Sequence, residues 1–333
     1  MENASRNLES PSEPKNSFLL DDTKYRPSPQ AFQCGEILEE AGEVGSVVFF
    51  STTPNHRLEF SCRGRSVGVL NDQEPVVSNE ELEEATAAVD PFFFDKGYTL
   101  AGRTGFQIWA GARLVLESLI WPLDQDPPRL VHWQRRLQET APCRIIELGS
   151  GVGLLGASFA AQGGEVLATD LPTLVENAIY PNQQRNKNNA PSSPCPEWLA
   201  ASSTVPIGSG WLGSTALDWT KPVQEQLSEI QRHNLDLIVA SDCVWLVSML
   251  DALLDTVASL FHFSPNATFL MSFQRRDVRK ESALFTTVDG ILSAVRCRGW
   301  ALDCLSWKYV KVDGDEEKKE VFLLEIRRDE SSS

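Results

Sequence analysis

The stretch that decides the fold is RIIELGSGVGLLG, residues Arg144 to Gly156. An apolar segment ends at Glu147 and Leu148, and three glycines follow at Gly149, Gly151 and Gly153. Glycines suit such a loop because the chain turns sharply there, and a Cβ atom would keep a ligand away from the backbone and from the N-terminus of the next helix. The pattern therefore predicts a strand, a ligand-binding turn and a helix.

The segments around this loop alternate between apolar strands and amphipathic helices. Besides the strand at 143–148, strands are predicted at 165–169, 215–219, 236–241 and 268–273, and helices near 109–120, 130–139, 154–161, 172 onward, 222–232, 249–261 and 280–297. Strands that alternate with helices form parallel sheets, so the pattern predicts an α/β fold with a Rossmann-like, mostly parallel sheet. Two final strands, 301–310 and 320–326, flank Asp313-Gly314 and predict a C-terminal β-hairpin.

The composition changes along the chain and predicts its organisation. Residues 1–32 are rich in Ser, Pro, Asn and charge, which is typical of a disordered tail, and 329–333 are expected to be a second one. Residues 33–99 are predicted to be an acidic, β-containing extension with strands at SVVFFST, HRLEFSCR and SVGVL. We expect the main domain to cover 100–328, with residues 189–214, rich in Pro, Ser and Gly, forming a loop or insertion.

Composition and charge exclude several classes of protein. With 42% hydrophobic and 23% charged residues, the chain can bury a core, and its net charge of −16 argues against nucleic acid or an anionic membrane as partner. The seven cysteines contain no CxxC pair and the four histidines no HxxxH spacing, so we predict neither a disulfide framework nor a metal site. No secretory signal or membrane-spanning run is seen, and we expect a monomer in the cytoplasm or nucleus.

A second acidic residue extends the predicted ligand site. Asp170 lies seventeen residues after Gly153, just beyond the second strand, where a carboxylate can accept hydrogen bonds from two ribose hydroxyls. Because Gly151, Gly153 and Gly156 also match the dinucleotide fingerprint, two cofactors fit. Glu147 favours S-adenosylmethionine, since an acid beside the glycines suits a cationic amino-acid end better than an anionic pyrophosphate. The motif itself leaves three interpretations open: a methyl donor, a nicotinamide dinucleotide, or a tight turn without a ligand.

Three segments, ELGSGVGLLG, GFQIWAGARLVLESL and DLIVASDCVW, together resemble the seven-β-strand protein-lysine methyltransferases of methyltransferase family 16. The resemblance covers about residues 105–327 and implies a seven-stranded sheet that binds S-adenosylmethionine. It also implies roles for single residues. The cofactor would be held by Trp109, Gly149, Ser150, Gly151, Gly153 and Ser241, its ribose by Asp170, and its adenine would lie against Trp219.

The two tryptophans have different support outside the resemblance. An adenine ring needs a flat apolar face, and stacking on an aromatic side chain contributes about 1 kcal/mol or more, so Trp219 suits an adenine site. The alternative for Trp219 is a place in the core. Trp109 lies in an otherwise apolar helical pattern, which by itself is typical of packing.

The acceptor end of the predicted site follows the strand at 236–241. An acid at the carboxyl end of a parallel strand faces the rim where ligands bind, so Asp242 is predicted to capture and orient a lysine amine. The family pattern there is D-x-x-Y, whereas this chain has Trp245 in place of the tyrosine. An indole cannot accept a hydrogen bond from an ammonium group but can present its π face, so Trp245 is expected to shape the lysine channel. The alternative for Asp242 is an N-cap of the helix that follows it.

The sequence thus predicts an S-adenosylmethionine-dependent methyltransferase that acts on lysine in a specific non-histone protein, with Asp242 and Trp245 at the acceptor site. Three rivals remain at this point. They are a small-molecule methyltransferase, an NAD-dependent oxidoreductase, and a non-catalytic protein that retains the cofactor and whose acceptor site has changed.

Overall fold

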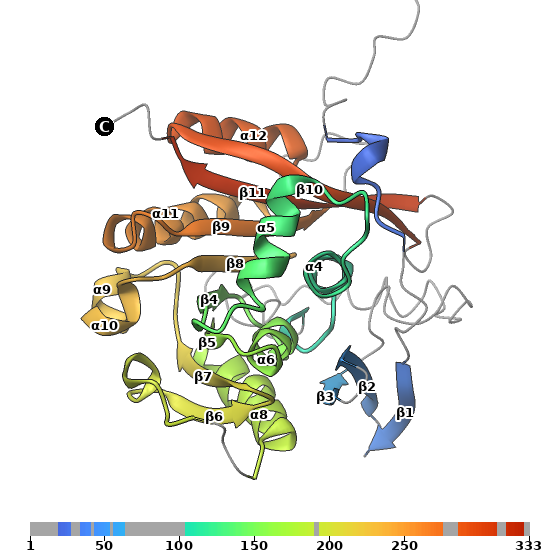
Figure 1. Cartoon of the computed structure of the whole chain (residues 1–333), viewed down its shortest axis with the longest axis vertical. Helices are drawn as coiled ribbons and strands as arrows, with labels where there is room; N and C mark the ends of the chain where they lie inside the picture. The colour runs from blue at the N-terminus through green and yellow to red at the C-terminus, as the bar shows by residue number, and fades with distance from the viewer. Residues whose placement is uncertain are drawn as a thin grey trace, which may run out of the picture.

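The computed structural model describes residues 19–27, 34–40, 43–53, 56–63, 104–189, 193–275, 286–311 and 318–329 (Figure 1). The centre is an eight-stranded sheet in the order β10-β11-β9-β8-β4-β5-β7-β6. Its strands are β4 (Arg144–Leu148), β5 (Glu165–Asp170), β6 (Ser203–Ile207), β7 (Gly210–Ala216), β8 (Leu237–Ser241), β9 (Thr268–Gln274), β10 (Trp300–Lys311) and β11 (Lys318–Arg328).

The five central strands, β9-β8-β4-β5-β7, are parallel, and the C-terminal hairpin β10–β11 pairs antiparallel with β9. The predicted α/β class and hairpin are therefore confirmed. The prediction of seven strands is wrong, because β6 adds an eighth that pairs antiparallel with β7. This strand lies inside residues 189–214, which were expected to form a loop. The turn of the β6–β7 hairpin is Gly208-Ser209 between two apolar runs, a hairpin signal that the prediction missed.

Alternate residues of the sheet face two separate layers of helices. Ile145 of β4 packs in one hydrophobic cluster with α4 (Ala110–Ile120), α5 (Pro128–Arg136) and α6 (Leu154–Ala161). Ile146 packs in a second cluster with α9 (Val223–Gln226), α11 (Val247–Phe263) and α12 (Val288–Cys297). The period-2 alternation of a strand thus buries both faces of the sheet.

The remaining helical elements are short: η1 (Asp22–Lys24), α7 (Pro172–Leu174), η2 (Val175–Ile179), α8 (Tyr180–Asn186), η3 (Glu197–Leu199) and α10 (Glu229–Arg232). The helix predicted at 154–161 matches α6. The single helix expected over 222–232 is instead the pair α9 and α10, divided at Leu227 and Ser228. No helix in the described part of the chain is both long and apolar enough to cross a bilayer.

A separate three-stranded sheet precedes the main domain in sequence: β1 (Cys34–Glu40), β2 (Glu43–Thr53) and β3 (His56–Arg63), paired antiparallel in that order. Two of its strands match the predicted SVVFFST and HRLEFSCR segments, β1 was not expected, and the predicted SVGVL strand lies outside the described residues. Leu58 and Phe60 of β3 are buried in the cluster that contains α6. The small sheet is therefore packed on the main domain.

Residues 19–27 differ from the disordered tail expected over 1–32. Leu19 is fully buried, the Arg26 amide donates to the Trp307 carbonyl oxygen (2.8 Å), and Tyr25 forms a β-bridge with Trp307. The Trp307 indole in turn donates to the carbonyl oxygen of Asp21 (2.8 Å). This part of the predicted tail is an ordered segment that runs along β10.

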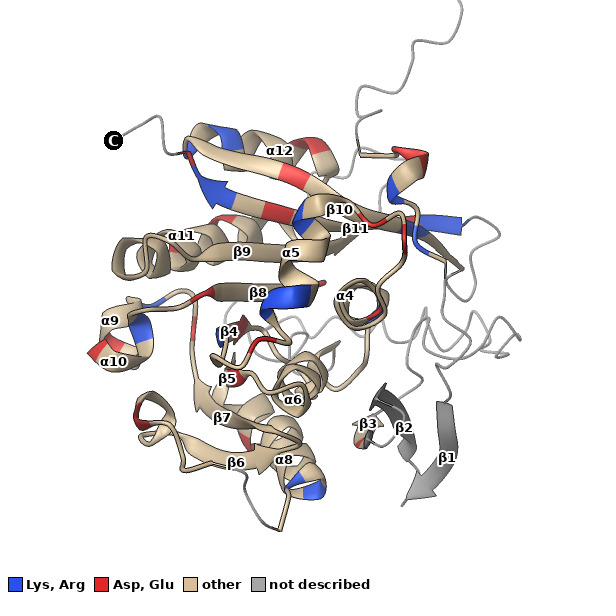
Figure 2. Cartoon of the chain, in the orientation of Figure 1, with Lys and Arg blue, Asp and Glu red and all other residues tan. Residues whose placement is uncertain are grey.

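Figure 2 marks the charged residues on the ribbon, and one group of them is buried between α4 and β10. Glu117 of α4 is fully buried and accepts from Arg113 (2.6 Å) and from the Lys308 ammonium of β10 (2.7 Å). Arg26 donates to the Glu117 carbonyl oxygen (2.6 Å) and pairs with Asp126. These contacts hold α4 against β10 and against the segment 19–27.

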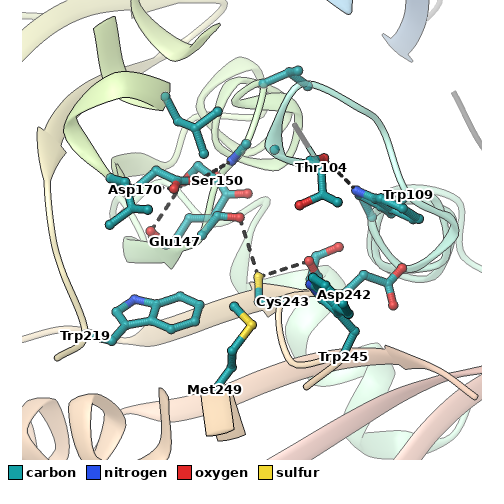
Figure 3. Close-up of a pocket in the computed structure, with 18 of the residues that line it drawn as sticks. Thr104, Trp109, Glu147, Ser150, Asp170, Trp219, Asp242, Cys243, Trp245 and Met249 are labelled. Carbon is teal, nitrogen blue, oxygen red and sulfur yellow. Dashed lines mark hydrogen bonds between the residues drawn. The ribbon is translucent and has the colours of Figure 1, made fainter. Parts of the chain in front are cut away.

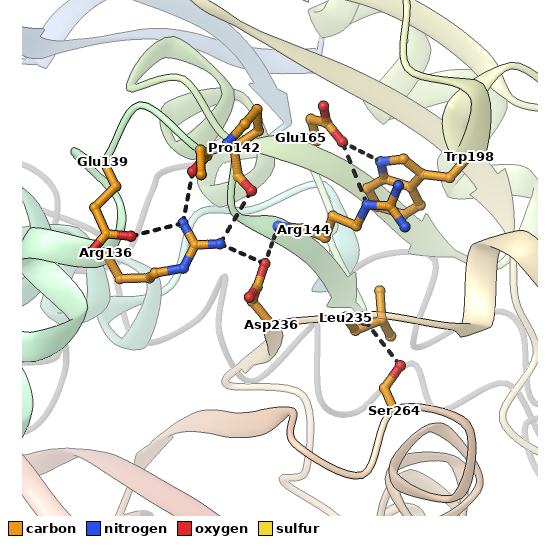
Figure 4. Close-up of polar contacts among 10 residues, drawn as sticks. Arg136, Glu139, Pro142, Arg144, Glu165, Trp198, Leu235, Asp236 and Ser264 are labelled. Carbon is orange, nitrogen blue, oxygen red and sulfur yellow. Dashed lines mark hydrogen bonds and ion pairs between the residues drawn. The ribbon is translucent and has the colours of Figure 1, made fainter.

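The amino ends of the central strands meet at an edge joined by polar contacts (Figure 4). The Asp236 carboxylate accepts from the Arg144 amide (2.8 Å) and from the Arg136 guanidinium (2.9 Å). At the same edge Glu165 accepts from the Trp198 indole (2.6 Å). The opposite edge, at the carboxyl ends, opens into the cavity described next.

Candidate active site

A cavity of about 490 Å³ lies at the carboxyl ends of the parallel strands (Figure 3). Loops after β4, β5, β7 and β8 and the N-terminal ends of α4 and α11 form its wall. Ten of the eleven residues predicted from the sequence line it: Trp109, Glu147, Gly149, Ser150, Gly151, Asp170, Trp219, Ser241, Asp242 and Trp245. The fold thus brings residues more than 130 positions apart in sequence to one cavity.

Backbone hydrogen bonds hold the start of the glycine loop against β5. The amides of Gly149 and Ser150 both donate to the Thr169 carbonyl oxygen of β5 (2.9 and 3.0 Å). Gly151 has a φ of 54°, and a Cβ there would lie 2.8 Å from the Gly105 carbonyl oxygen. A side chain at position 151 would therefore meet both left-handed strain and a backbone clash.

Gly153 is the predicted residue that does not line the cavity. It is the N-cap of α6 with a φ of 80°, and a Cβ there would approach Ile179 to 3.4 Å. Gly156, in the first turn of α6, lies close to the sheet, because a Cβ there would be 2.9 Å from Glu147 Oε2 and 3.0 Å from Leu212. These two glycines shape the turn and the helix packing behind the cavity.

Two buried carboxyl groups line the cavity next to the loop. Glu147 Oε2 accepts from the Gly156 amide (2.9 Å), and burial raises the pKa of Glu147 to about 8. Asp170 accepts from the amides of Gly151 (2.8 Å) and Leu171 (2.7 Å), and burial raises the pKa of Asp170 to about 6. Burial removes hydration from both groups, which favours their neutral forms.

Two tryptophans lie at different sides of the cavity in Figure 3. Trp219 is half-buried, and its ring passes about 3.2 Å from the position that a Gly149 Cβ would occupy. Trp109 is the N-cap of α4, and its indole donates to the Thr104 carbonyl oxygen (3.0 Å). Both side chains line the cavity, so neither is only a core residue.

Asp242 is an acid of the site that two other elements hold in place. It has a φ of 51°, it is 6% exposed, and its two carboxylate oxygens accept from backbone amides of different elements. Oδ2 accepts from Gly111 in the first turn of α4 (2.5 Å), and Oδ1 accepts from Gln274 at the end of β9 (2.8 Å). The interpretation of Asp242 as an N-cap of its own following helix is wrong, because α11 begins at Val247 and the carboxylate binds the N-terminus of α4 instead.

Cys243 and Trp245 follow this aspartate. The Cys243 thiol donates to carbonyl oxygens of Ser241 (3.1 Å) and Leu148 (3.4 Å), and burial raises its pKa well above the usual value. A neutral, hydrogen-bonded thiol is a poor nucleophile. Trp245 lies next to Asp242 in Figure 3 and is half-buried at the cavity wall. Its indole presents apolar surface and a donor, not an acceptor, to this end of the cavity.

The cavity is also lined by residues that were not predicted from the sequence, among them Thr104, Gly105, Gln107 and Met249. Gly105 and Gln107 belong to the GFQIW segment, from which only the tryptophan was selected. Met249 begins the helix predicted near 249–261, and a single sequence gives no signal that this apolar position turns toward a cavity. Thr104 had no distinguishing pattern.

The donor set of the cavity distinguishes between the two candidate cofactors. Glu147 and Asp170 place two acids beside the glycine loop, where the negative charge of a pyrophosphate would oppose the ionisation of either acid and a cation would favour it. A cationic amino-acid end and a ribose suit these acids. The residues therefore fit S-adenosylmethionine better than a dinucleotide. No group of three or more His, Cys, Asp or Glu that could hold a metal ion is found among the described residues.

Comparison with known proteins agrees with this geometry. A family profile described as lysine methyltransferase matches residues 98–290. The chain is 31% identical over 170 residues to EEF1A lysine methyltransferase 3 of Mus musculus, covering 50% of this chain and 59% of the relative. It is 29% identical over 148 residues to protein-lysine N-methyltransferase rrg1 of Schizosaccharomyces pombe, covering 42% and 37%. The matches therefore span less than two thirds of either relative.

Among solved structures, the chain is similar to a magnesium protoporphyrin IX methyltransferase from Synechocystis with bound S-adenosylhomocysteine. The sequence identity is 12% and the TM-score 0.39, with 73% of this chain and 99% of that one covered.

Proposed function

Because the chain belongs to the lysine methyltransferase family, we propose that it is an S-adenosylmethionine-dependent enzyme that methylates a lysine of a specific non-histone protein. The observation that carries the proposal is the position of Asp242. This acid faces the same cavity as the glycine loop, and backbone amides of two elements hold its carboxylate in place.

The residues of the loop side fit the cofactor. Gly149 and Gly151 leave the backbone bare, Asp170 can accept hydrogen bonds from ribose hydroxyls, and Glu147 can face the amino-acid end. Trp219 offers a flat face for adenine. When bound, S-adenosylmethionine supplies a methyl group on a positively charged sulfur.

The residues of the acceptor side suit a lysine. The Asp242 carboxylate attracts the ammonium and orients it, and Trp245 presents an aromatic face to the same cation. Because the site holds the amine in line with the methyl group, their reaction becomes effectively intramolecular, which is the principal contribution of such a site to the rate. The amine must lose a proton before it attacks, and a general base is not required for this if water reaches the site.

Calorimetry with S-adenosylmethionine and with NAD tests the cofactor. Binding of the methyl donor is expected, and binding of NAD alone would overturn the proposal. Incubation with labelled methyl donor and a cell extract then tests the reaction. A labelled protein band that disappears with Asp242→Asn supports lysine methylation. Donor binding without any labelled product would instead indicate a non-catalytic protein. That alternative is suggested by Trp245, which stands where the family pattern has a tyrosine.

The proposal includes a monomer that acts on protein in the cytoplasm or nucleus. The net charge of −16 supports a basic or lysine-bearing partner over nucleic acid or an anionic membrane. Light scattering after size exclusion measures the oligomeric state, and a stable dimer would contradict this part of the proposal.

A further inference from the structure

Helix α8 carries three amide side chains that connect separate parts of the fold. Gln183 is 1% exposed and faces the sheet edge, where its Nε2 donates to the Leu212 carbonyl oxygen (3.1 Å) and its Oε1 accepts from Ser214 (2.9 Å). Asn182 and Asn186, one turn apart, contact strand β3 instead. The helix is therefore fixed to the main sheet and in turn holds the small N-terminal sheet.

The two asparagines make the same pair of contacts with β3. Asn182 Oδ1 accepts from the Ser61 amide (2.9 Å), and its Nδ2 donates to the Ser61 carbonyl oxygen (3.2 Å). Asn186 binds the amide and carbonyl of Glu59 in the same way (2.8 Å each). Residues 59 and 61 are alternate positions of a strand, so their outward groups are those that a further strand would pair. The two side chains take the place of that strand.

The third hydrogen bond of each asparagine is different. Asn186 Nδ2 also donates to the Asn182 carbonyl oxygen (2.9 Å), within the same helix. Asn182 Nδ2 also donates to the carbonyl oxygen of Val152 (3.0 Å), which lies between Gly151 and Gly153 in the glycine loop. Val152 is 2% exposed and lines the cavity. Asn182 thus joins β3 and the loop through one amide group.

The loop conformation matters for any ligand above it. Gly151 donates its amide to Asp170 and Gly153 begins α6, so the Val152 peptide lies between two positions that determine the direction of the loop. A buried carbonyl without a donor would tend to rotate toward water or another donor. The Val152 carbonyl and the Gly153 amide share one peptide plane, and that amide donates to the Ser150 carbonyl oxygen (2.8 Å). The rotation would therefore disturb the hydrogen bond that closes this turn of the loop.

We propose that Asn182 is a positioning residue for cofactor binding, which couples the docked N-terminal sheet to the glycine loop through the Val152 carbonyl. The inference rests on the proposed function only in that the loop binds S-adenosylmethionine. Asn182 itself does not line the cavity, and it acts through Val152.

The test compares Asn182→Asp with Asn186→Asp. Both changes keep an acceptor for the β3 amide, remove a donor, and add one negative charge to the same helix. Calorimetry of the full chain with S-adenosylmethionine is expected to show about tenfold weaker binding for Asn182→Asp and a change within twofold for Asn186→Asp. The turnover at saturating cofactor is expected to stay within about twofold of the wild type.

A second measurement does not depend on the cofactor. Hydrogen exchange of the amides at 149–153 is expected to be faster in Asn182→Asp than in Asn186→Asp, and a milder pair, Asn182→Ser and Asn186→Ser, serves if the first pair does not fold. Equal effects of the two positions on both affinity and loop exchange would overturn the inference. Absence of donor binding by the wild type would count against the proposed function instead, and the exchange result would then decide the inference alone.

Discussion

Replacing Glu147 by glutamine tests whether the cavity keeps this acid neutral in the absence of a ligand. Glutamine has nearly the same shape, its oxygen can still accept from the Gly156 amide, and it has no proton to release. The ordinary pKa of 4.5 rises to about 8 in the folded protein because burial removes hydration, and nearby Asp170 adds a smaller effect in the same direction. The unfolded chain has the ordinary value.

The sign and size of the effect follow from proton linkage. Between pH 4.5 and about 8 the unfolded chain has released the Glu147 proton while the folded protein keeps it, so the free energy of unfolding falls as the pH rises. At about 1.4 kcal/mol per pKa unit, the Glu147 contribution lost between pH 5 and 7.5 is roughly 3 kcal/mol. Glutamine removes this slope. Asp170, with a pKa of about 6, titrates in both proteins, so its contribution cancels when one free energy of unfolding is subtracted from the other.

Urea unfolding of the protein without cofactor, at pH 5, 6, 7 and 7.5, measures the two free energies of unfolding. From pH 5 to 7.5, the free energy of unfolding of the variant is expected to rise by roughly 3 kcal/mol relative to that of the wild type, whatever the difference between them at pH 5. A difference that stays constant within about 0.5 kcal/mol, the usual effect of a surface change, would show that Glu147 is ionised in the empty cavity and would refute the reasoning.

Four further predictions concern the same cavity. Gly111→Ala would place a Cβ 2.5 Å from Asp242 Oδ2 and even closer to Ser272 Oγ, so the carboxylate must shift and turnover should fall more than tenfold. Gly290→Ala in α12, with only a 3.2 Å contact, should leave turnover unchanged in the same labelling assay. Gly151→Arg, at a φ of 54°, should abolish donor binding in calorimetry while circular dichroism stays that of the wild type. Asp242→Asn should lower turnover at least a hundredfold and also lower the free energy of unfolding by about 1–3 kcal/mol, because its NH2 group would face an amide donor; unchanged urea unfolding would contradict this. Binding of the cationic methyl donor should release protons at pH 7, seen as a buffer-dependent enthalpy, and Glu147→Gln should reduce that release.

Periodicity was sufficient for the parts of the fold where burial alone determines structure. Strands β4, β5 and β9 and helix α6 lie within a residue or two of the expected ranges, because each is an apolar run bounded by glycine or polar residues. The eighth strand was missed since a high content of Pro, Ser and Gly outweighed the Gly208-Ser209 turn signal. The segment 19–27 was missed for another reason. Its polar composition hides Leu19 and Arg26, which are buried only through contacts with β10 and α4.

The candidate site shows the same division between local pattern and long-range contact. The glycines, Glu147 and Asp170 could be predicted because their spacing follows from one strand-turn-helix unit and the next strand. The backbone donors that hold Asp242 could not, since Gly111 and Gln274 belong to elements that only the complete fold brings together. The hydrogen bonds of Asn182 are another example of long-range contacts.

The proposed capture of a lysine by Asp242 is compatible with the contact of its carboxylate with a helix N-terminus, although that helix is α4 and not the expected one. A carboxylate has about four acceptor positions, so accepting from the amides of Gly111 and Gln274 does not by itself exclude a lysine ammonium. Capping the N-terminus of α4 also favours the charged form of an acid, because the helix dipole is positive there. In the proposed reaction, the contact that fixes the carboxylate in the fold would therefore also stabilise a negative charge next to the lysine. For this reason any substitution of Asp242 changes stability together with catalysis, and Gly111→Ala, which leaves the carboxylate intact but displaces it, separates position from charge.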